Sequence, residues 1–392
     1  MKETKFKNTE IGRIPEEWET LYIHQITEIS TGATPSTNIN EYWENGTIRW
    51  MSSGELNNKI IYDVNGRITQ KGYDNTGTHM LPKNCVLIGL AGQGKTRGTA
   101  AYNKVELCTN QSIAAILPNS KYESKYLYFY IDSLYDKLRL LSAGDGGRGG
   151  LNKQILQNLE IAMPPLNEQH HIASALTSID NLISSLGKLI EKKKNIKQGT
   201  MQQLLTGQIR LKGFSEPWGE KKLEEVCSVK RGVRVVKRNL TTDGLYPVYQ
   251  NTNFPLGYSN QYNVEANTPF VIIGGSAGQV GICRERYWAA DDCAFFACHD
   301  IYKEYLYYVL LLNQSNILHN VRTGTIPRLD RSFLSNMVVY ISSNLDEQQA
   351  IATILTKMDD EITALEAKRA KYEAIKQGMM QQLLTGKIRL IS

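Results

Sequence analysis

The sequence lacks long hydrophobic runs and has few cysteines. Its 392 residues are 41% hydrophobic and 21% charged, and no apolar stretch approaches the roughly 18 residues that a membrane span needs. The polar opening MKETKFKNTEIGRIPEEW is unlike a secretory signal. The six cysteines include no C-x-x-C pair, which is too sparse for a disulfide framework or a zinc knuckle. These absences predict a cytoplasmic protein that spans no membrane and holds no metal.

The chain also lacks a strong excess of charge of one sign. The net charge is +6, and segments 1–166 and 213–345 each carry only +1. A role in binding nucleic acid would therefore depend on local groups and not on a broad basic surface.

Signatures of catalysis are missing, with one exception. The chain has no G-x-S-x-G, no H-E-x-x-H and no N-P-P-[FYW] tetrapeptide. The exception is Gly89–Thr96, GLAGQGKT, which matches the P-loop pattern in full. A P-loop needs a helix that begins at its lysine, but the residues after Lys95, RGTAAYNKVELCTNQ, predict a strand, a turn and another strand. Nucleotide binding through Gly89–Thr96 is therefore kept as the alternative function, and no cofactor is expected.

What the chain does contain is an internal repeat. Residues 167–211 align without a gap to residues 346–390, a shift of 179, and 24 of the 45 positions are identical. In each copy apolar residues step by three and four, which is the 3.5-residue period of a coiled-coil seam. The residues expected to pair along this seam are Ile172, Leu176, Ile179, Ile183, Leu186 and Ile190 in the first copy and Ile351, Leu355, Met358, Ile362 and Leu365 in the second.

Each copy predicts one long helix of about 39 residues, or roughly 58 Å. Asn167 and Asp346 are the expected N-caps, and Gly207 and Gly386 are expected to end the helices. Because such a helix exceeds one globular core, the two copies are expected to pair with each other, and the order of the chain makes that pairing antiparallel. The alternative is that each helix lies along the surface of a domain.

The blocks before the helices also match, more faintly. Trp18 and Gly32 correspond to Trp218 and Gly232 at a shift of 200. The run VLIGLAGQG resembles the later run VIIGGSAGQVG, and both predict a strand that enters a glycine-rich turn. The two blocks are therefore expected to be similar domains.

The predicted fold is α+β, with two pseudo-two-fold-related globular domains separated by two long antiparallel coiled-coil helices. The expected parts are a first globular domain at 1–165, a first spacer helix at 166–212, a second globular domain at 213–345 and a second spacer helix at 346–392.

Five stretches carry a resemblance to a known family. They are EIGRIPEEWE, GLAGQGKTRGT, the L-N-x-x-x-L-x-x-L-x-I run at Leu151–Ile161, P-P-L-N-E-Q, and the repeated IKQGxMQQLLTGxIRL. Together they resemble the specificity subunits of type I restriction–modification systems over nearly the whole chain. The resemblance implies that each globular domain is a target recognition domain for one half of a bipartite DNA site. It also implies that the helices are the family's conserved spacers, which set the gap and dock two adenine-methyltransferase subunits, and that translocating nuclease subunits join this core.

The resemblance further implies that the chain has no active site of its own, in agreement with the missing catalytic motifs. Glycine-rich loops with isolated basic residues suit close approach to phosphates and base edges. The DNA-binding candidates are Lys95, Arg97 and Arg148 in the first domain and Arg231, Arg234, Arg322 and Arg328 in the second. A coiled-coil adaptor that binds protein and no DNA is the other competing class.

Overall fold

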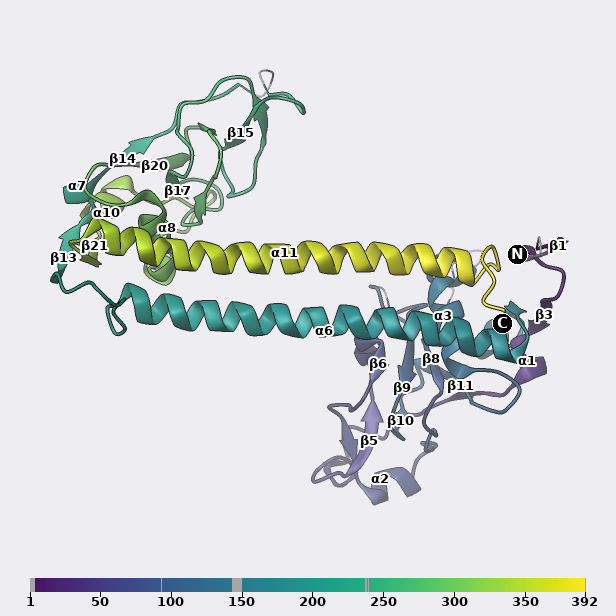
Figure 1. The fold of residues 1–392 in the computed structure, drawn as a ribbon. Coiled ribbons are helices and arrows are strands. Elements are labelled where there is room, and N and C mark those ends of the chain that lie inside the picture. The colour runs from purple at the N-terminus through teal and green to yellow at the C-terminus, as the bar shows by residue number, and fades with distance from the viewer. Residues whose placement is uncertain (1–3, 93, 143–149, 237, 239, 392) are drawn as a thin grey trace. The chain divides into compact units, whose positions relative to one another are not determined.

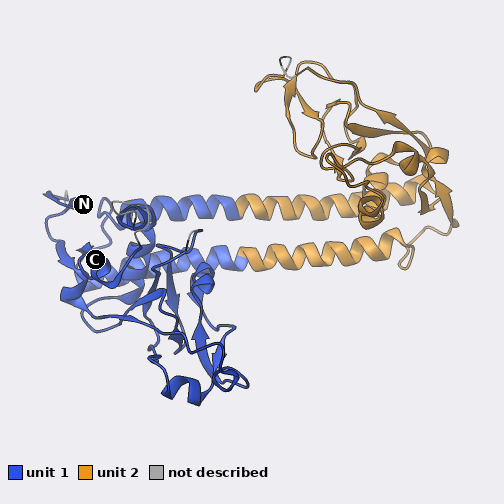
Figure 2. Ribbon diagram, turned by 180° about the vertical axis from the view of Figure 1, so that it is seen from behind, with its two compact units in different colours: residues 1–185, 369–392 blue, residues 186–368 orange. Residues whose placement is uncertain are grey.

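The computed structural model describes residues 4–92, 94–142, 150–236, 238 and 240–391. They form an α+β protein with two compact units, residues 1–185 with 369–392 (unit 1) and residues 186–368 (unit 2), which Figure 2 shows in different colours. Two long helices, α6 (Leu166–Leu205) and α11 (Leu345–Leu383), each begin in one unit and end in the other (Figure 1). None of the helices in the described part of the chain combines the length and the apolarity that a bilayer span requires.

Unit 1 is built on a five-stranded sheet in the order β4-β11-β8-β9-β6. Its strands are β4 (Ile29–Thr31), β6 (Ile60–Ile61), β8 (Val86–Gly89), β9 (Ala100–Asn103) and β11 (Ile113–Ile116). Smaller sheets join β5 (Ile48–Met51), β7 (Arg67–Ile68) and β10 (Cys108–Thr109), then β1 (Phe6–Thr9) with β2 (Gly12–Pro15), and β3 (Glu19–Tyr22) with β12 (Glu160–Met163). The shorter helices are α1 (Ile23–Ile26), α2 (Gln70–Asp74), α3 (Ser124–Ser133), α4 (Tyr135–Leu141) and α5 (Lys153–Gln157).

Unit 2 repeats this plan on a four-stranded sheet in the order β14-β20-β17-β18. Its strands are β14 (Cys227–Arg231), β17 (Pro269–Ile272), β18 (Val280–Ile282) and β20 (Cys293–Cys298). Smaller sheets join β15 (Tyr246–Tyr249), β16 (Gly257–Ser259) and β19 (Trp288–Ala289), and β13 (Trp218–Lys222) with β21 (Val338–Ser342). The shorter helices are α7 (Leu223–Val226), α8 (Lys303–Leu312), α9 (Gln314–His319) and α10 (Arg331–Asn336).

The main sheet of each unit is buried on both faces. Along β8, Val86 packs into the core that includes residues of the long helices, and Leu87 packs into a second core. Along β17, Val271 and Ile272 divide between two cores in the same way. Because side chains alternate along a strand, burial on both faces produces an unbroken apolar run. This is why the two runs stand out in the sequence.

The two glycine-rich turns are offset from their sequence alignment. Ile113 pairs with Gly89, and its counterpart Cys293 pairs with Ile272. Gly89 is therefore equivalent to Ile272, and not to Gly274 as the aligned runs predict. The alignment is wrong by two residues because matching letters in a turn do not determine strand pairing, and a shift of two keeps each side chain on the same face.

Glycines end both long helices, as expected. Gly207 and Gly386 have positive φ angles of 70° and 68°, a conformation that favours glycine after a helix. The expected N-caps are wrong, because Asn167 and Asp346 lie inside α6 and α11. At α11 it is Oδ1 of Asn344 that accepts hydrogen bonds from the backbone N–H of Asp346 (2.8 Å) and of the next residue (3.0 Å).

Ion pairs join the two long helices inside unit 2. Lys193 of α6 pairs with Glu361 of α11 at 2.7 Å, and Lys197 pairs with Asp359 at 2.5 Å. The residue number rises along α6 while it falls along α11, so the helices are antiparallel there. The Lys197 and Asp359 side chains are only 17% and 28% exposed, which shields this pair from solvent.

The same contact recurs inside unit 1. Lys376 of α11 pairs with Asp180 of α6 at 2.6 Å, and both residues lie 179 positions from their unit 2 counterparts. The internal repeat therefore preserves the contacts between the helices as well as the helices themselves.

The predicted seam residues fall into two groups. Those near the helix starts belong to the globular cores and are at most 1% exposed: Ile172, Leu176, Ile351 and Leu355. Further along the helices the buried ones are Ile179, Leu186, Ile190 and Ile362, and the partly exposed ones are Ile183, Met358 and Leu365. The helix starts thus pack on the globular cores, and ion pairs link the helices to each other.

A buried carboxylate joins distant segments of the chain in unit 1. Glu168, near the start of α6, is 2% exposed and accepts hydrogen bonds from Nε (2.7 Å) and a terminal nitrogen (2.8 Å) of Arg389. It also accepts one from Nε1 of Trp18 at 3.0 Å. Beside them, Nδ1 of His171 lies 2.8 Å from the carbonyl oxygen of Leu390. Residues from three distant parts of the chain therefore meet at one charge.

Unit 2 has the equivalent arrangement. Glu347, near the start of α11, is fully buried and accepts hydrogen bonds from Arg210 at 2.7 and 2.9 Å and from Nε1 of Trp218 at 2.9 Å. In each unit the carboxylate starts one long helix, and the arginine follows the end of the other. Since an unpaired buried charge is costly, each unit depends on both helices.

We expect Arg389→Ala to destabilise unit 1 by on the order of 3 kcal/mol, because it leaves Glu168 buried without its ion-pair partner. Arg210→Ala should destabilise unit 2 by less, since the Arg210 side chain is 31% exposed and that of Arg389 only 6%. Hydrogen-exchange mass spectrometry resolves the two units by their peptides. Lys387→Ala, an exposed change in the same tail, is the control, and equal effects of the two arginine variants would contradict this ranking.

The Glu347 site of unit 2 also predicts that stability depends on pH. Burial favours the neutral form of Glu347, but hydrogen bonds from Arg210, Ser342 and Trp218 outweigh it and hold the pKa of Glu347 below its usual value. The stability that the carboxylate contributes is therefore present above about pH 4.3 and is lost as the pH falls through the lowered pKa. We expect the difference in unfolding free energy between the wild type and Glu347→Gln to be constant from pH 7 to 5 and to shrink below about pH 4. Urea denaturation across this range measures it, and a difference independent of pH would disprove the assignment.

Candidate nucleic-acid interface

Several strand ends of unit 1 meet at one edge of the sheets. The N–H of Asn110 donates to the carbonyl of Met51 (3.1 Å), and the N–H of Leu90 donates to the carbonyl of Ser112 (2.8 Å). The turn before β11 therefore touches the ends of both β5 and β8. We call this region the loop edge of unit 1, and it comprises residues 32–34, 52–53, 90–92, 94–99 and 110–112.

Unit 2 has the equivalent loop edge. The N–H of Ala290 donates to the carbonyl of Tyr249, and the N–H of Ile273 donates to that of Asp292, both at 2.8 Å. Its residues are 231–234, 250–254, 273–279, 290–292 and 322–328. The backbone hydrogen bonds inside each loop edge therefore correspond between the units.

A glycine is required at the same place in both edges. A Cβ on Gly32 would lie 1.8 Å from the carbonyl oxygen of Thr109, and one on Gly232 would lie 2.2 Å from that of Ala290. Both distances are far shorter than a van der Waals contact. The absence of a side chain lets the end of β4 or β14 lie directly on the neighbouring turn.

The loop edge of unit 2 gathers two of the predicted basic residues around carboxylates. Arg231 donates from Nε to the backbone oxygen of Asp291 at 2.7 Å, and its guanidinium lies 3.9 Å from that carboxylate. Arg328 pairs with Asp292 at 3.1 Å. These arginines are half exposed or more, with side-chain exposures of 50% and 57%, so the carboxylates orient them without removing them from solvent.

The remaining two predicted residues of unit 2 lie beside this cluster. Arg322 is 81% exposed, lies 3.8 Å from Asp330, and exchanges backbone hydrogen bonds with Arg328. Arg234 is exposed and follows Gly232 by two residues. The structure therefore brings all four predicted residues of this unit to one loop edge.

The loop edge of unit 1 contains Lys95 and Arg97. Lys95 is exposed and Arg97 is partly buried, with one guanidinium nitrogen 3.4 Å from Oγ of Ser142. Arg139 of α4 donates to the carbonyl of Gly94 at 2.7 Å and holds this loop from the side. Arg148, the third predicted residue, lies outside the described residues.

The P-loop alternative is not supported by this geometry. Strand β9 (Ala100–Asn103) follows Lys95, where a phosphate-binding loop requires a helix. The loop carbonyls also point at donors of the protein itself, because the Lys95 oxygen accepts from Oγ1 of Thr99 (2.6 Å) and from the hydroxyl of Tyr135 (3.2 Å). The segment is a connection between two antiparallel strands, as the residues after Lys95 predict.

The sequence reasoning missed three kinds of residue at the edges. The sequence gives no local signal for Arg139, because the loop that it contacts lies more than 40 positions away. Asp291 and Asp292 precede an apolar strand, which is a detectable signal for a turn, but their arginine partners come from other segments. Gln111 is exposed, and its Oε1 accepts a hydrogen bond from Oγ1 of Thr34 at 2.5 Å.

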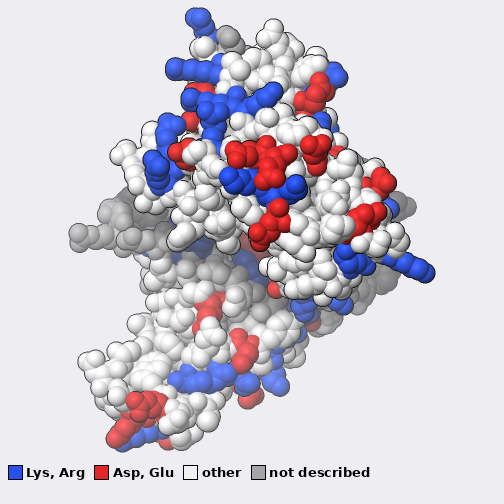
Figure 3. Space-filling model, turned by 90° about the vertical axis from the view of Figure 1, so that its left-hand side faces the viewer, with Lys and Arg blue, Asp and Glu red and all other residues white. Residues whose placement is uncertain are grey.

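Charges of both signs are interspersed on the surface. Figure 3 shows Lys and Arg side chains standing among Asp and Glu side chains on the face drawn there. This agrees with the small net charge of the globular segments. Any contact with a polyanion therefore depends on a few placed cations.

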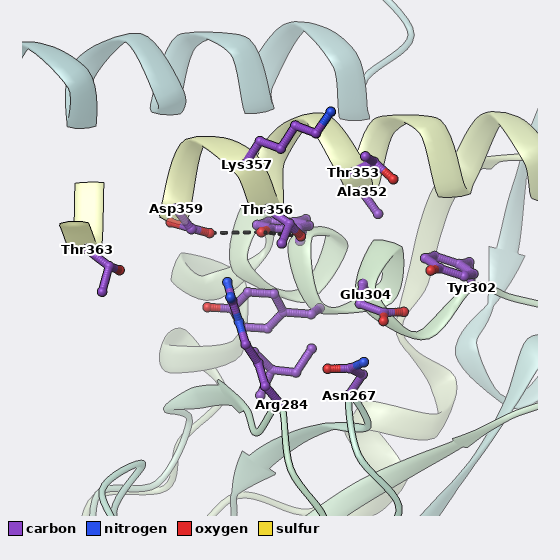
Figure 4. A pocket seen from close by; sticks show the side chains of 13 residues that line it. Asn267, Arg284, Tyr302, Glu304, Ala352, Thr353, Thr356, Lys357, Asp359 and Thr363 are labelled. Atoms are coloured by element: carbon purple, nitrogen blue, oxygen red, sulfur yellow. Dashed lines mark hydrogen bonds between the residues drawn. The ribbon is translucent and has the colours of Figure 1, made fainter. Parts of the chain in front are cut away.

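A cavity of about 620 Å³ lies elsewhere in unit 2, between α8, α11 and the strands beside Asn267 and Arg284 (Figure 4). The hydroxyl of Tyr308 donates to Oδ2 of Asp359 at 2.8 Å and lies 3.1 Å from Oγ1 of Thr356. Asp359 is thus used by Tyr308 as well as by the ion pair between the helices. These hydrogen bonds between Tyr308, Thr356 and Asp359 fix α8 on α11.

The described residues contain no group of three or more His, Cys, Asp or Glu side chains placed to bind a metal ion. The six cysteines are free thiols. Burial raises the pKa of Cys108 to about 11 and that of Cys298 to about 12, so these thiols are protonated and unreactive at neutral pH.

Both halves of the chain match one family model, described as the type I restriction modification DNA specificity domain, over residues 15–198 and 215–377. The chain is 27% identical over 433 aligned residues to the type I restriction enzyme MjaVIII specificity subunit of Methanocaldococcus jannaschii, covering 99% of this chain and 97% of that protein. It is 35% identical over 191 residues to the MjaIX specificity subunit of the same organism, covering 47% of this chain and only 43% of that protein.

A solved structure has the same fold. The crystal structure of a type I restriction–modification S subunit from M. genitalium aligns with a TM-score of 0.71 at 18% identity, covering 97% of this chain and 98% of that one.

Proposed function

Because the chain belongs to the family of type I restriction–modification DNA specificity subunits, we propose that each unit recognises one half of a bipartite target on double-stranded DNA through its loop edge. The chain is the specificity component of such a system and not its catalytic subunit. Its partners are DNA, two adenine-methyltransferase subunits and the translocating nuclease subunits that join them.

One observation carries this proposal. The two loop edges share their backbone bonds and their required glycine, but they carry different exposed side chains. Unit 1 has Lys95 and Gln111 at its edge, and unit 2 has Arg234 and Arg328. A shared scaffold with different tips suits the reading of two different half-sites, since phosphate contacts position a protein and base contacts specify the sequence.

The long helices set the gap between the half-sites and dock the methyltransferase subunits. Each helix belongs to both units, and the ion pairs at Asp180 and Asp359 fix the register of the two helices inside each unit. A helix rises about 1.5 Å per residue, so its length is set by its residue count. Two such helices that cannot slide along each other can act as a spacer.

Exchange of one unit tests the assignment of half-sites. We expect replacement of residues 23–150 by the equivalent block of a relative to change one half of the methylated sequence and leave the other half and the gap unchanged. The exchange keeps β3, β12 and the Glu168 site, so unit 1 retains its closure. Methylome sequencing of a strain that carries the chimaera and its methyltransferase reads the result.

The matched control is the corresponding exchange in unit 2, residues 227–335, which should change the other half only. A chimaera that alters both halves, or neither half while methylation persists, would contradict the modular assignment.

Matched insertions test the spacer role. Seven residues added at 185/186 in α6 and seven at 368/369 in α11 keep the apolar seam in phase. Each helix becomes longer by about 10.5 Å, or roughly three base pairs at about 3.4 Å per step. We expect both half-sites to be kept and the unspecified gap to widen by up to about three base pairs, as read from the methylome.

An insertion in α6 alone is the control for this experiment. It leaves one helix longer than its partner, so apolar seam residues lose their neighbours and the yield of folded chain should fall. An unchanged gap in an active double-insertion variant would show that the helices do not measure distance.

A further inference from the structure

The two loop edges carry different side chains at two equivalent positions. Residue 34 corresponds to residue 234, because each follows the required glycine by two. Residue 111 corresponds to residue 291, because each follows the residue whose backbone N–H donates to the last carbonyl of β5 or β15. Unit 1 has Thr34 and Gln111 there, and unit 2 has Arg234 and Asp291.

Two hydrogen bonds position Gln111, one within its own turn and one from Thr34. Oδ1 of Asn110 accepts a hydrogen bond from the N–H of Ser112 at 3.1 Å, which folds the backbone around Gln111 into a tight turn. Oγ1 of Thr34 donates to Oε1 of Gln111 at 2.5 Å. Both side chains are exposed, so the oriented amide faces solvent and not the core.

This orientation leaves the amide with the groups that an adenine needs. A glutamine reads adenine in the major groove by accepting from N6 and donating to N7. An amide oxygen has two acceptor sites, so the bond from Thr34 occupies one and leaves the second for N6, while the amide nitrogen supplies the donor. The methyl group of Thr34 beside it suits the methyl group of the thymine in the same base pair.

From the proposed function and this geometry, we infer that Gln111, positioned by Thr34, reads an A·T pair in the half-site of unit 1. At the equivalent positions unit 2 has Arg234, whose exposed guanidinium suits guanine, and Asp291, whose partly buried carboxylate lies 3.9 Å from Arg231. The two half-sites therefore differ at the base pair that faces these positions, although the surrounding backbone is the same.

The test is a binding selection from a pool of random double-stranded DNA, using the full chain assembled with its methyltransferase subunits. The wild type is expected to select a bipartite sequence with adenine at one position of one half-site. Gln111→Ala should lower the preference at that base pair by about tenfold to a hundredfold and leave every other position unchanged. Gln111→Glu, which can only accept, should shift the preference to cytosine.

Thr34 is tested as a positioning residue. Thr34→Ser keeps the donor and loses only the methyl group, so it should keep most of the adenine preference. Thr34→Val removes the donor and should weaken the preference more, at the same base pair as Gln111→Ala. Asn8→Asp, an amide-to-carboxylate change on β1 at another exposed position, is the control for charge and should not alter the selected sequence.

The possible results distinguish the proposed function of the chain from the role of Gln111. A wild-type selection without any enriched sequence would overturn the proposed function and this inference together. If the wild type selects a bipartite site, an unchanged site with Gln111→Ala, or a uniform loss of binding to all sequences, would overturn the assignment of Gln111 alone.

Discussion

The rest of the structure depends on a buried carboxylate at the start of each long helix. A charge in a protein core is tolerated only when it is paired and its remaining acceptor sites are filled. Glu168 and Glu347 meet this requirement with an arginine and a tryptophan each. Because each arginine follows the end of the other helix, neither unit can satisfy its carboxylate from one half of the repeat. The alternation of block and helix along the chain is therefore a physical requirement of both units.

The second constraint lies at the loop edges, where backbone contacts do the positioning. The close approach at Gly32 and Gly232 involves carbonyl oxygens, and the bonds from Asn110 and Ala290 also join backbone groups. None of these contacts depends on the identity of the exposed side chains beside them. The tips can therefore change from Thr and Gln to Arg and Asp without a change in the scaffold, which is what a module that reads different sequences needs.

Much of this fold could be predicted from the sequence because the signals are local. The two long helices, the glycines at their ends and the strand after Lys95 all follow from neighbouring residues. What could not be predicted depends on pairing between distant segments. The offset of two residues at Gly89 comes from strand register, and the role of Arg139 comes from a loop far away in the chain. The four basic candidates of unit 2 lie at one edge, but their carboxylate partners there could not be predicted.

Those carboxylates bear on how the chain binds DNA under the proposed function. Arg231 and Arg328 already pair with Asp291 and Asp292, so a phosphate that approaches them must compete with an acid only a few ångströms away. Each such exchange releases less counterion free energy than neutralisation of an unpaired arginine would. Nonspecific binding by this chain is thereby weakened, whereas a base edge that fits between the arginine and the acid still gains its hydrogen bonds. Under the proposed function, the mixed charge at the edge of unit 2 thus favours discrimination between sequences over affinity for DNA in general.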